Sequence, residues 1–178
     1  MYFDELDSFL IRFKAREVRR EDEDDIIDEI LDLYILGYLD GSQEAARELG
    51  IETRPSVEEM MDTIEKPVAG KTFRQRISEY LNGEGDVSPK DGIARVVDTD
   101  ATRIYNTAIL ETGIKNGATQ KTWVTMADDR VRETHDWLEG MTVPIDSYFY
   151  TGGDKALAPG GFENPENNVN CRCVLKIS

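Results

Sequence analysis

Apolar side chains recur at helical spacing through the first half of the chain. The first set lies three or four residues apart and comprises Phe3, Leu6, Phe9, Leu10 and Phe13. This spacing predicts an amphipathic helix over residues 2–20. From about residue 24 to 39 the apolar face is too wide for an isolated surface helix, so we expect neighbouring elements to cover it.

Turn signals divide the rest of this half. Gly41 interrupts the helical pattern, which resumes and then ends at Gly50. Residues 56–66 are expected to form a helix that begins with a capping box, a Ser followed three residues later by Glu. Further helices are expected over residues 72–82 and 93–116, with a linker rich in Gly, Pro and Asp between them.

The pattern changes in the last third of the chain. Residues 120–126 are rich in β-branched and aromatic types and predict a strand, residues 128–140 predict a short helix, and residues 170–178 predict a last strand. The expected fold class is therefore α+β. We expect a helical region over residues 1–90, followed by a small C-terminal α+β domain with a short sheet over residues 91–178.

Composition and charge narrow the function classes. The chain has 178 residues and a formal net charge of -15, which argues against a broad phosphate-binding face because such a face needs clustered Lys and Arg. We therefore disfavour nucleic acid as a partner. No stretch resembles a signal peptide or reaches the roughly 20 apolar residues of a membrane span, so we expect a cytoplasmic protein without a membrane partner.

The charges are uneven near the N-terminus. A basic run, whose arginines are Arg12, Arg16, Arg19 and Arg20, is followed by a run of acidic residues from Glu21 to Asp25. One interpretation is a solvated helix face. The other is an electrostatic docking patch for another protein, together with Ile30 and Tyr34 on the wide apolar face of the next helix.

The two cysteines of the chain lie two residues apart near its end. Cys171 and Cys173 share one face of the predicted last strand, together with Leu175, and a disulfide between them would require a bend in the strand. His135 follows Val131 at helical spacing on an apolar stripe, so its imidazole is expected to point inward toward the same face.

This arrangement has two interpretations. His135, Cys171 and Cys173 can bind zinc, although the spacing selects no fourth ligand. Alternatively, the cysteines and the histidine are metal-free core residues. We expect no cofactor, with zinc as the alternative. The chain lacks the usual phosphate-binding loops, an HExxH motif and a GxSxG motif.

Three segments, in this order, resemble the Mu F-like domain of phage minor head proteins, the phage head morphogenesis family: TDATRIYNTAILETG, TWVTMADDRVRETHDWLEGMTV and the closing NCRC. The resemblance extends over about residues 95–178. The positions of this chain that match the family pattern are Thr99, Arg103, Asn106, Trp123, Asp129, Arg130, Arg132, His135, Gly140, Asn170, Cys171, Arg172 and Cys173.

The resemblance implies a non-enzymatic minor head protein that associates with the phage portal or capsid protein during head assembly or genome delivery. It implies a location in the host cytoplasm during assembly and then in the virion head. Since the family motif ends the chain, we expect no toxin domain after it. Two other functions remain as alternatives: a His135-centred, zinc-dependent hydrolase or effector delivered with the genome, and a DNA-contacting protein inside the capsid.

Overall fold

The fold consists of a layer of helices with a small layer of strands packed on one side of it. The computed structural model describes residues 2–127 and 131–178. Its helices are α1 (Tyr2–Ala15), η1 (Arg20–Asp22), α2 (Glu23–Leu49), α3 (Val57–Ile64), α4 (Phe73–Leu81), α5 (Pro89–Lys115), α6 (Glu133–Asp136) and η2 (Pro165–Asn167). Its strands are β1 (Gln120–Val124), β2 (Thr142–Pro144), β3 (Phe149–Thr151), β4 (Asp154–Ala156) and β5 (Val174–Ile177). The predicted α+β class is confirmed.

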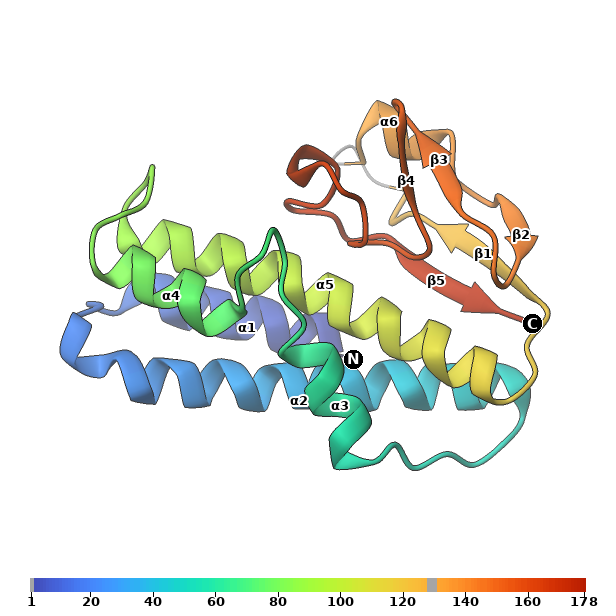
Figure 1. The fold of residues 1–178 in the computed structure, drawn as a ribbon, viewed down its shortest axis with the longest axis horizontal. Coiled ribbons are helices and arrows are strands. Elements are labelled where there is room, and N and C mark those ends of the chain that lie inside the picture. Colours follow the sequence, from blue (N-terminus) through green and yellow to red (C-terminus); the bar gives the residue numbers. More distant parts are fainter. Residues whose placement is uncertain (1, 128–130) are drawn as a thin grey trace.

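Helix α5 is the centre of the packing. It contacts α1, α2, α3, α4 and the last strand β5, and α2 lies along much of its length (Figure 1). The strands lie over the C-terminal half of α5 (Figure 1), and β5 also contacts the end of α2 through a hydrogen bond from Ile177 to Glu48. Buried apolar residues of the helical region and of the strands belong to one hydrophobic cluster. None of the described helices has both the length and the apolar character needed to cross a membrane.

The strands form two antiparallel units. The larger sheet has the order β2-β1-β5, and β3 pairs with β4 in a separate hairpin. In the larger sheet Trp123 lies opposite Leu175, and Lys121 lies opposite both Val143 and Ile177. Strand β1 connects directly to α5 through a short turn, so the sheet is held close to the end of that helix.

The helix starts predicted at residues 56 and 72 agree with the structure, whereas α5 begins at Pro89, before the start predicted at residue 93. Ser56 accepts a hydrogen bond from the backbone of Glu59, and the Glu59 side chain accepts one from the backbone of Ser56, which confirms the capping box. Thr72 and Gln75 form the same motif at the start of α4. These caps satisfy backbone N–H groups that have no partner within the helix.

The predicted break at Gly41 is wrong. Helix α2 continues through Gly41 to Leu49, and the glycine has a packing role. A Cβ atom at Gly41 would lie 2.4 Å from the backbone oxygen of Tyr105, and one at Gly37 would lie 2.5 Å from the Tyr2 ring. Glycine therefore marks where α1 and α5 approach α2 closely, and the helical backbone is uninterrupted.

Two C-terminal elements are shorter than predicted. The helix expected over residues 128–140 is the single turn α6, and part of that range lies outside the described residues. The last strand begins at Val174, after both cysteines. The alternation of burial nevertheless extends back to Cys171, so the two cysteines do share an inward face as predicted.

Two predicted docking residues are in the core, so that part of the prediction is wrong. Ile30 and Tyr34 are 0% exposed, and the Tyr34 ring packs against Phe73 with 5.2 Å between ring centroids. The wide apolar face of α2 is covered by α1, α4 and α5. Of the four arginines, Arg12, Arg19 and Arg20 are exposed, and Arg16 is half-buried.

A buried lysine lies on the inward face of β1. Lys121 is 0% exposed, and its ammonium has no hydrogen-bond partner among the described residues. Its Nζ atom lies 5.5 Å from the centroid of the Phe149 ring. Burial lowers the pKa of Lys121 to about 8, against a small opposing effect of Asp146.

This burial makes stability depend on pH through Lys121. Below pH 8 the folded state holds a buried ammonium, so Lys121→Met should raise the free energy of unfolding by about 1–3 kcal/mol. Between the folded pKa of about 8 and the ordinary value of 10.5, only the unfolded chain stays protonated, so the advantage of the variant should shrink. Urea unfolding of the wild type and the variant at pH 7 and pH 10 measures this difference in the free energy of unfolding.

The control for this measurement is Lys176→Met, which removes an exposed lysine from the neighbouring strand β5. That change should alter stability by less than about 0.5 kcal/mol at either pH. An equal effect of Lys121→Met at the two pH values would show that the buried charge is not the cause.

Candidate functional site

Two polar side chains of α5 hold the main chain of the C-terminal segment. The Thr102 hydroxyl donates to the backbone oxygen of Cys171 at 2.7 Å. The Asn106 amide nitrogen donates to the backbone oxygen of Cys173 at 3.0 Å, and its oxygen accepts from the backbone nitrogen of Leu175 at 2.7 Å. Thr102 and Asn106 are one helical turn apart and buried, so they fix the segment along α5.

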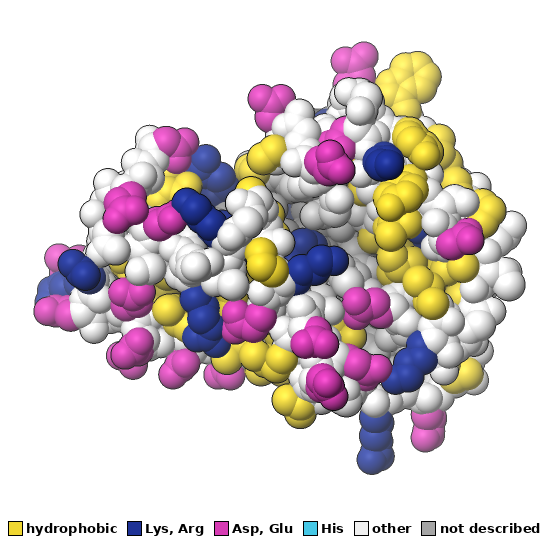
Figure 2. All heavy atoms as spheres, in the orientation of Figure 1, with side chains coloured by type: hydrophobic (Ala, Val, Ile, Leu, Met, Phe, Trp, Pro, Cys, Tyr) yellow, Lys and Arg dark blue, Asp and Glu magenta, His cyan; other side chains and the backbone are white. Residues whose placement is uncertain are grey.

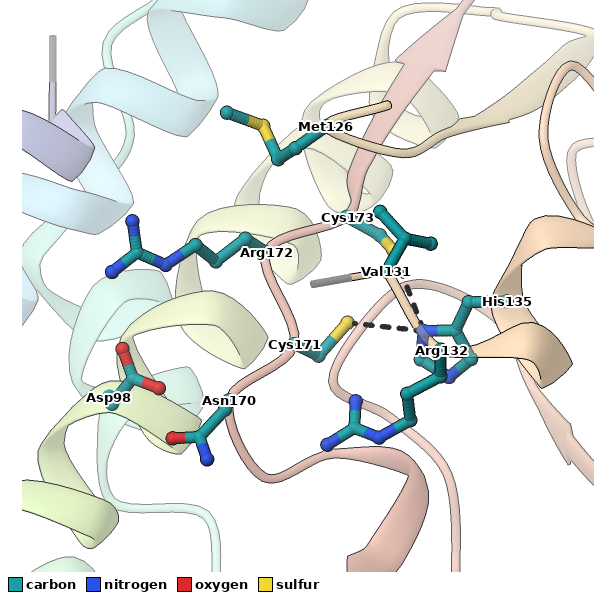
Figure 3. Close-up of a pocket in the computed structure, with 9 residues that line it drawn as sticks. All are labelled: Asp98, Met126, Val131, Arg132, His135, Asn170, Cys171, Arg172 and Cys173. Carbon is teal, nitrogen blue, oxygen red and sulfur yellow. Dashed lines mark hydrogen bonds between the residues drawn. The ribbon is translucent and has the colours of Figure 1, made fainter. Parts of the chain in front are cut away.

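Because the main chain of this segment is bound to α5, the two cysteine side chains point to the other side, toward α6. The Nδ1 atom of His135 lies 3.6 Å from the sulfur of Cys171 and 3.5 Å from the sulfur of Cys173. Figure 3 shows both sulfurs directed at the imidazole, whereas Arg172 extends away from it. Both thiols are free and all three residues are buried. The predicted meeting of His135 with the cysteine face is confirmed.

The two neighbouring thiols shift each other's pKa in opposite directions. A hydrogen bond with the Cys173 thiol, and a weaker one with His135, lower the pKa of Cys171. The same interaction with Cys171, together with burial, raises the pKa of Cys173. A single thiolate is therefore favoured within the pair, and the second thiol is the group that donates to it.

Aromatic side chains enclose the histidine. The Trp123 ring meets the imidazole edge to face at 5.5 Å between centroids, and Phe162 lies at 5.6 Å. The Phe149 ring also packs against the Trp123 ring, with 5.2 Å between the ring centroids. The Nε2 atom of His135 is buried and has no hydrogen-bond partner within the described ranges. The ring is therefore positioned by packing, with Nδ1 directed at the sulfurs.

A cavity of about 440 Å³ adjoins the sulfurs and the imidazole. Its lining includes Asp98 from α5 and Arg132 from the segment before α6 (Figure 3). Burial raises the pKa of Asp98, and the charge of Arg172 opposes that shift. Arg172 itself binds Asp7 on α1 at 2.6 Å, which ties the cavity wall to the N-terminal helix. The cavity therefore presents a carboxyl group and a guanidinium beside two thiols.

A comparison with known protein families gives one match that covers most of the chain. The family model described as "Phage Mu protein F like protein" matches residues 54–176, which is most of the chain. The chain belongs to the phage Mu protein F like family. The Mu F-like match begins before the expected boundary at residue 90 and includes α3, α4 and all of α5.

Part of this chain is also similar in sequence to a much longer curated protein. The NAD(+)-arginine ADP-ribosyltransferase EFV of Enterococcus faecalis is 30% identical over 112 residues, which cover 59% of this chain and 22% of that protein. The chain thus spans less than a quarter of the length of this relative. No solved structure matches the chain.

Several Mu F-like pattern residues hold the backbone in place. Arg103 donates to the backbone oxygen of Thr63 at 3.0 Å and lies 3.6 Å from the buried carboxylate of Asp100. Arg132 donates to the backbone oxygen of Val169. These guanidinium groups connect separate loops and helices and so help to hold the backbone, and Arg132 also lines the cavity.

Other Mu F-like pattern residues meet local backbone or packing needs. Gly140 and Asn170 have positive φ angles of 68° and 55°, which glycine and asparagine tolerate best. Trp123 is fully buried beside His135, and Thr99 is half-buried on α5. Asp129 and Arg130 lie outside the described residues.

The sequence alone did not identify two residues at the site. Thr102 and Asp98 are buried polar residues on α5. The sequence feature that could have indicated them is the presence of polar side chains on a helix that is apolar on nearly every face. A helix surrounded by neighbouring elements buries polar groups only where these groups have hydrogen-bond partners. That signal is weak without the structure, because it does not show which partner each residue meets.

The role of Asn106 can be tested by removing its amide. Asn106→Ala should lower the free energy of unfolding by about 2–4 kcal/mol, because the buried Cys173 carbonyl and Leu175 amide lose their partners. Asn116→Ala is the matched control: its amide donates to Thr112 on the same helix but is less buried, so we expect less than about 1 kcal/mol. Chemical denaturation measures both, and equal costs would contradict the proposed clamp.

Proposed function

We propose that this protein is a non-enzymatic minor head protein that binds the portal or procapsid during phage head assembly. The observation that carries the proposal is the Mu F-like match over residues 54–176. The protein acts first in the host cytoplasm and then within the virion head. The net charge of -15 supports a protein partner over DNA, because close approach to packaged DNA would place like charges together.

The docking surface that we assign is the groove between α1 and α2. It has a volume of about 470 Å³, with Phe9, Phe13 and Leu33 among its apolar lining residues. Leu36 also lines it and is 43% exposed, and Ile11 on α1 is 71% exposed. Exposed apolar side chains beside a groove are typical of a protein-binding surface.

Two arginines of the basic run carry free positive charge: Arg12 lines the groove, and Arg20 lies on η1, directly before α2. Arg16 binds Glu29 at 2.9 Å and Arg19 binds Glu17 at 2.7 Å, so both are largely neutralised. Arg12 and Arg20 are exposed and form no ion pair with any residue that the structure describes. They are therefore the arginines of the basic run that an acidic partner surface would meet.

The test is co-elution with the portal oligomer from the same phage. Size-exclusion chromatography with light scattering should give a complex of defined stoichiometry. Arg12→Glu with Arg20→Glu should weaken that complex about tenfold at low salt, and less at high salt, because exposed charges are screened. Arg54→Glu with Lys66→Glu changes the net charge equally at exposed positions away from α1 and should leave binding unchanged.

Two results would count against the proposal. Separate elution from both the portal and the capsid protein would remove the assembly role and favour the delivered effector. Equal weakening by the two double variants would show that net charge, and not the α1–α2 groove, controls the association.

A further inference from the structure

Three soft donor atoms converge beside the cavity. The sulfurs of Cys171 and Cys173 and the Nδ1 atom of His135 all lie within 4.8 Å of one another. The residues are 2%, 4% and 1% exposed, so water does not compete freely for these atoms. Thiolate and imidazole are the ligands that zinc prefers.

The two nitrogen–sulfur separations agree with those around one tetrahedral ion. Zinc lies about 2.3 Å from a thiolate sulfur and about 2.0–2.1 Å from an imidazole nitrogen, which places the nitrogen about 3.5 Å from each sulfur at a tetrahedral angle. The two nitrogen–sulfur distances here are 3.6 Å and 3.5 Å. The donors therefore need little movement to bind a metal.

Hydrogen bonding alone accounts poorly for the nearly equal distances from the Nδ1 atom of His135 to the two sulfurs. A single imidazole nitrogen either carries one proton or accepts one, so it can make one strong hydrogen bond at a time. Here Nδ1 faces two sulfurs at nearly equal distance. A metal ion satisfies all three donors together, because it binds the nitrogen lone pair and both thiolates.

We propose that His135, Cys171 and Cys173 bind one Zn²⁺ ion, with its fourth position facing the cavity lined by Asp98 and Arg132. The ligands come from two separately positioned elements: α6, and the segment that Thr102 and Asn106 fix on α5. Three protein ligands and one open position leave room for water or a small anion. The site does not depend on the proposed portal docking.

The first test is the metal content of the full chain, purified without an affinity tag and with a phosphine reductant that leaves zinc bound. Mass spectrometry of the metal should give about one zinc per chain. After replacement by Co²⁺, a thiolate-to-cobalt charge-transfer band and the visible bands of a tetrahedral site should appear. Azide should shift the visible bands by taking the position that faces the cavity.

Variants assign the ligands. Cys171→Ser, Cys173→Ser and His135→Gln should each lose most of the zinc and the cobalt bands. Asp136→Asn is the control, because this residue follows His135 but is exposed, and it should keep full zinc content. If a ligand variant does not fold, the wild-type chain still decides: zinc added to the metal-free protein should raise its melting temperature.

Three outcomes would overturn the proposal. Wild-type protein without zinc and without a cobalt charge-transfer band would leave a hydrogen-bonded thiol–imidazole cluster. Zinc retained by folded ligand variants would be an adventitious ion bound elsewhere. Cobalt bands that azide does not change would show that a protein group fills the fourth position, which would refute the open site.

Discussion

The hydrogen bonds from Thr102 and Asn106 to the main chain of residues 171–175 determine how the C-terminal part is built. These bonds hold the segment along α5, and its pairing with β1 begins at Val174, directly after the two cysteines. From there β5 aligns β1, and β1 brings Trp123 opposite Leu175. The chain that follows β1 then carries His135 to the two sulfurs. One pair of polar side chains therefore sets both the sheet register and the positions of the donor atoms.

The same helix joins this site to the helical layer. The backbone of α5 approaches Gly41 so closely that a Cβ atom at this position of α2 would overlap the backbone oxygen of Tyr105. A buried ion pair of Asp100 with Arg76 connects α5 to α4. Because breaking a buried ion pair leaves an unpaired charge, this contact resists separation of the two helices. Helix α5 therefore contacts both the other helices and the cysteine segment.

The sequence predicted the helices well because their signals are local. Apolar spacing and the cap at Ser56 located most helix limits without tertiary information. Gly41 was misread because its propensity signal is the same for a helix break and for a close helix contact. Ile30 and Tyr34 were misassigned because periodicity shows that a face needs covering but not whether the same chain covers it. At the site, alternation placed the cysteines inward, whereas the partners on α5 required the tertiary structure.

Two physical groups stand out among the family-pattern residues that the structure describes. The amide of Asn106 and the turns at Gly140 and Asn170 are accounted for by backbone contacts or dihedral angles. His135, Cys171 and Cys173 are not: their donor atoms face one another beside a cavity, and apolar side chains would fill the same volume without burying polar atoms. A purely architectural role explains the first group completely. The second group retains a chemical capacity that the fold itself does not require.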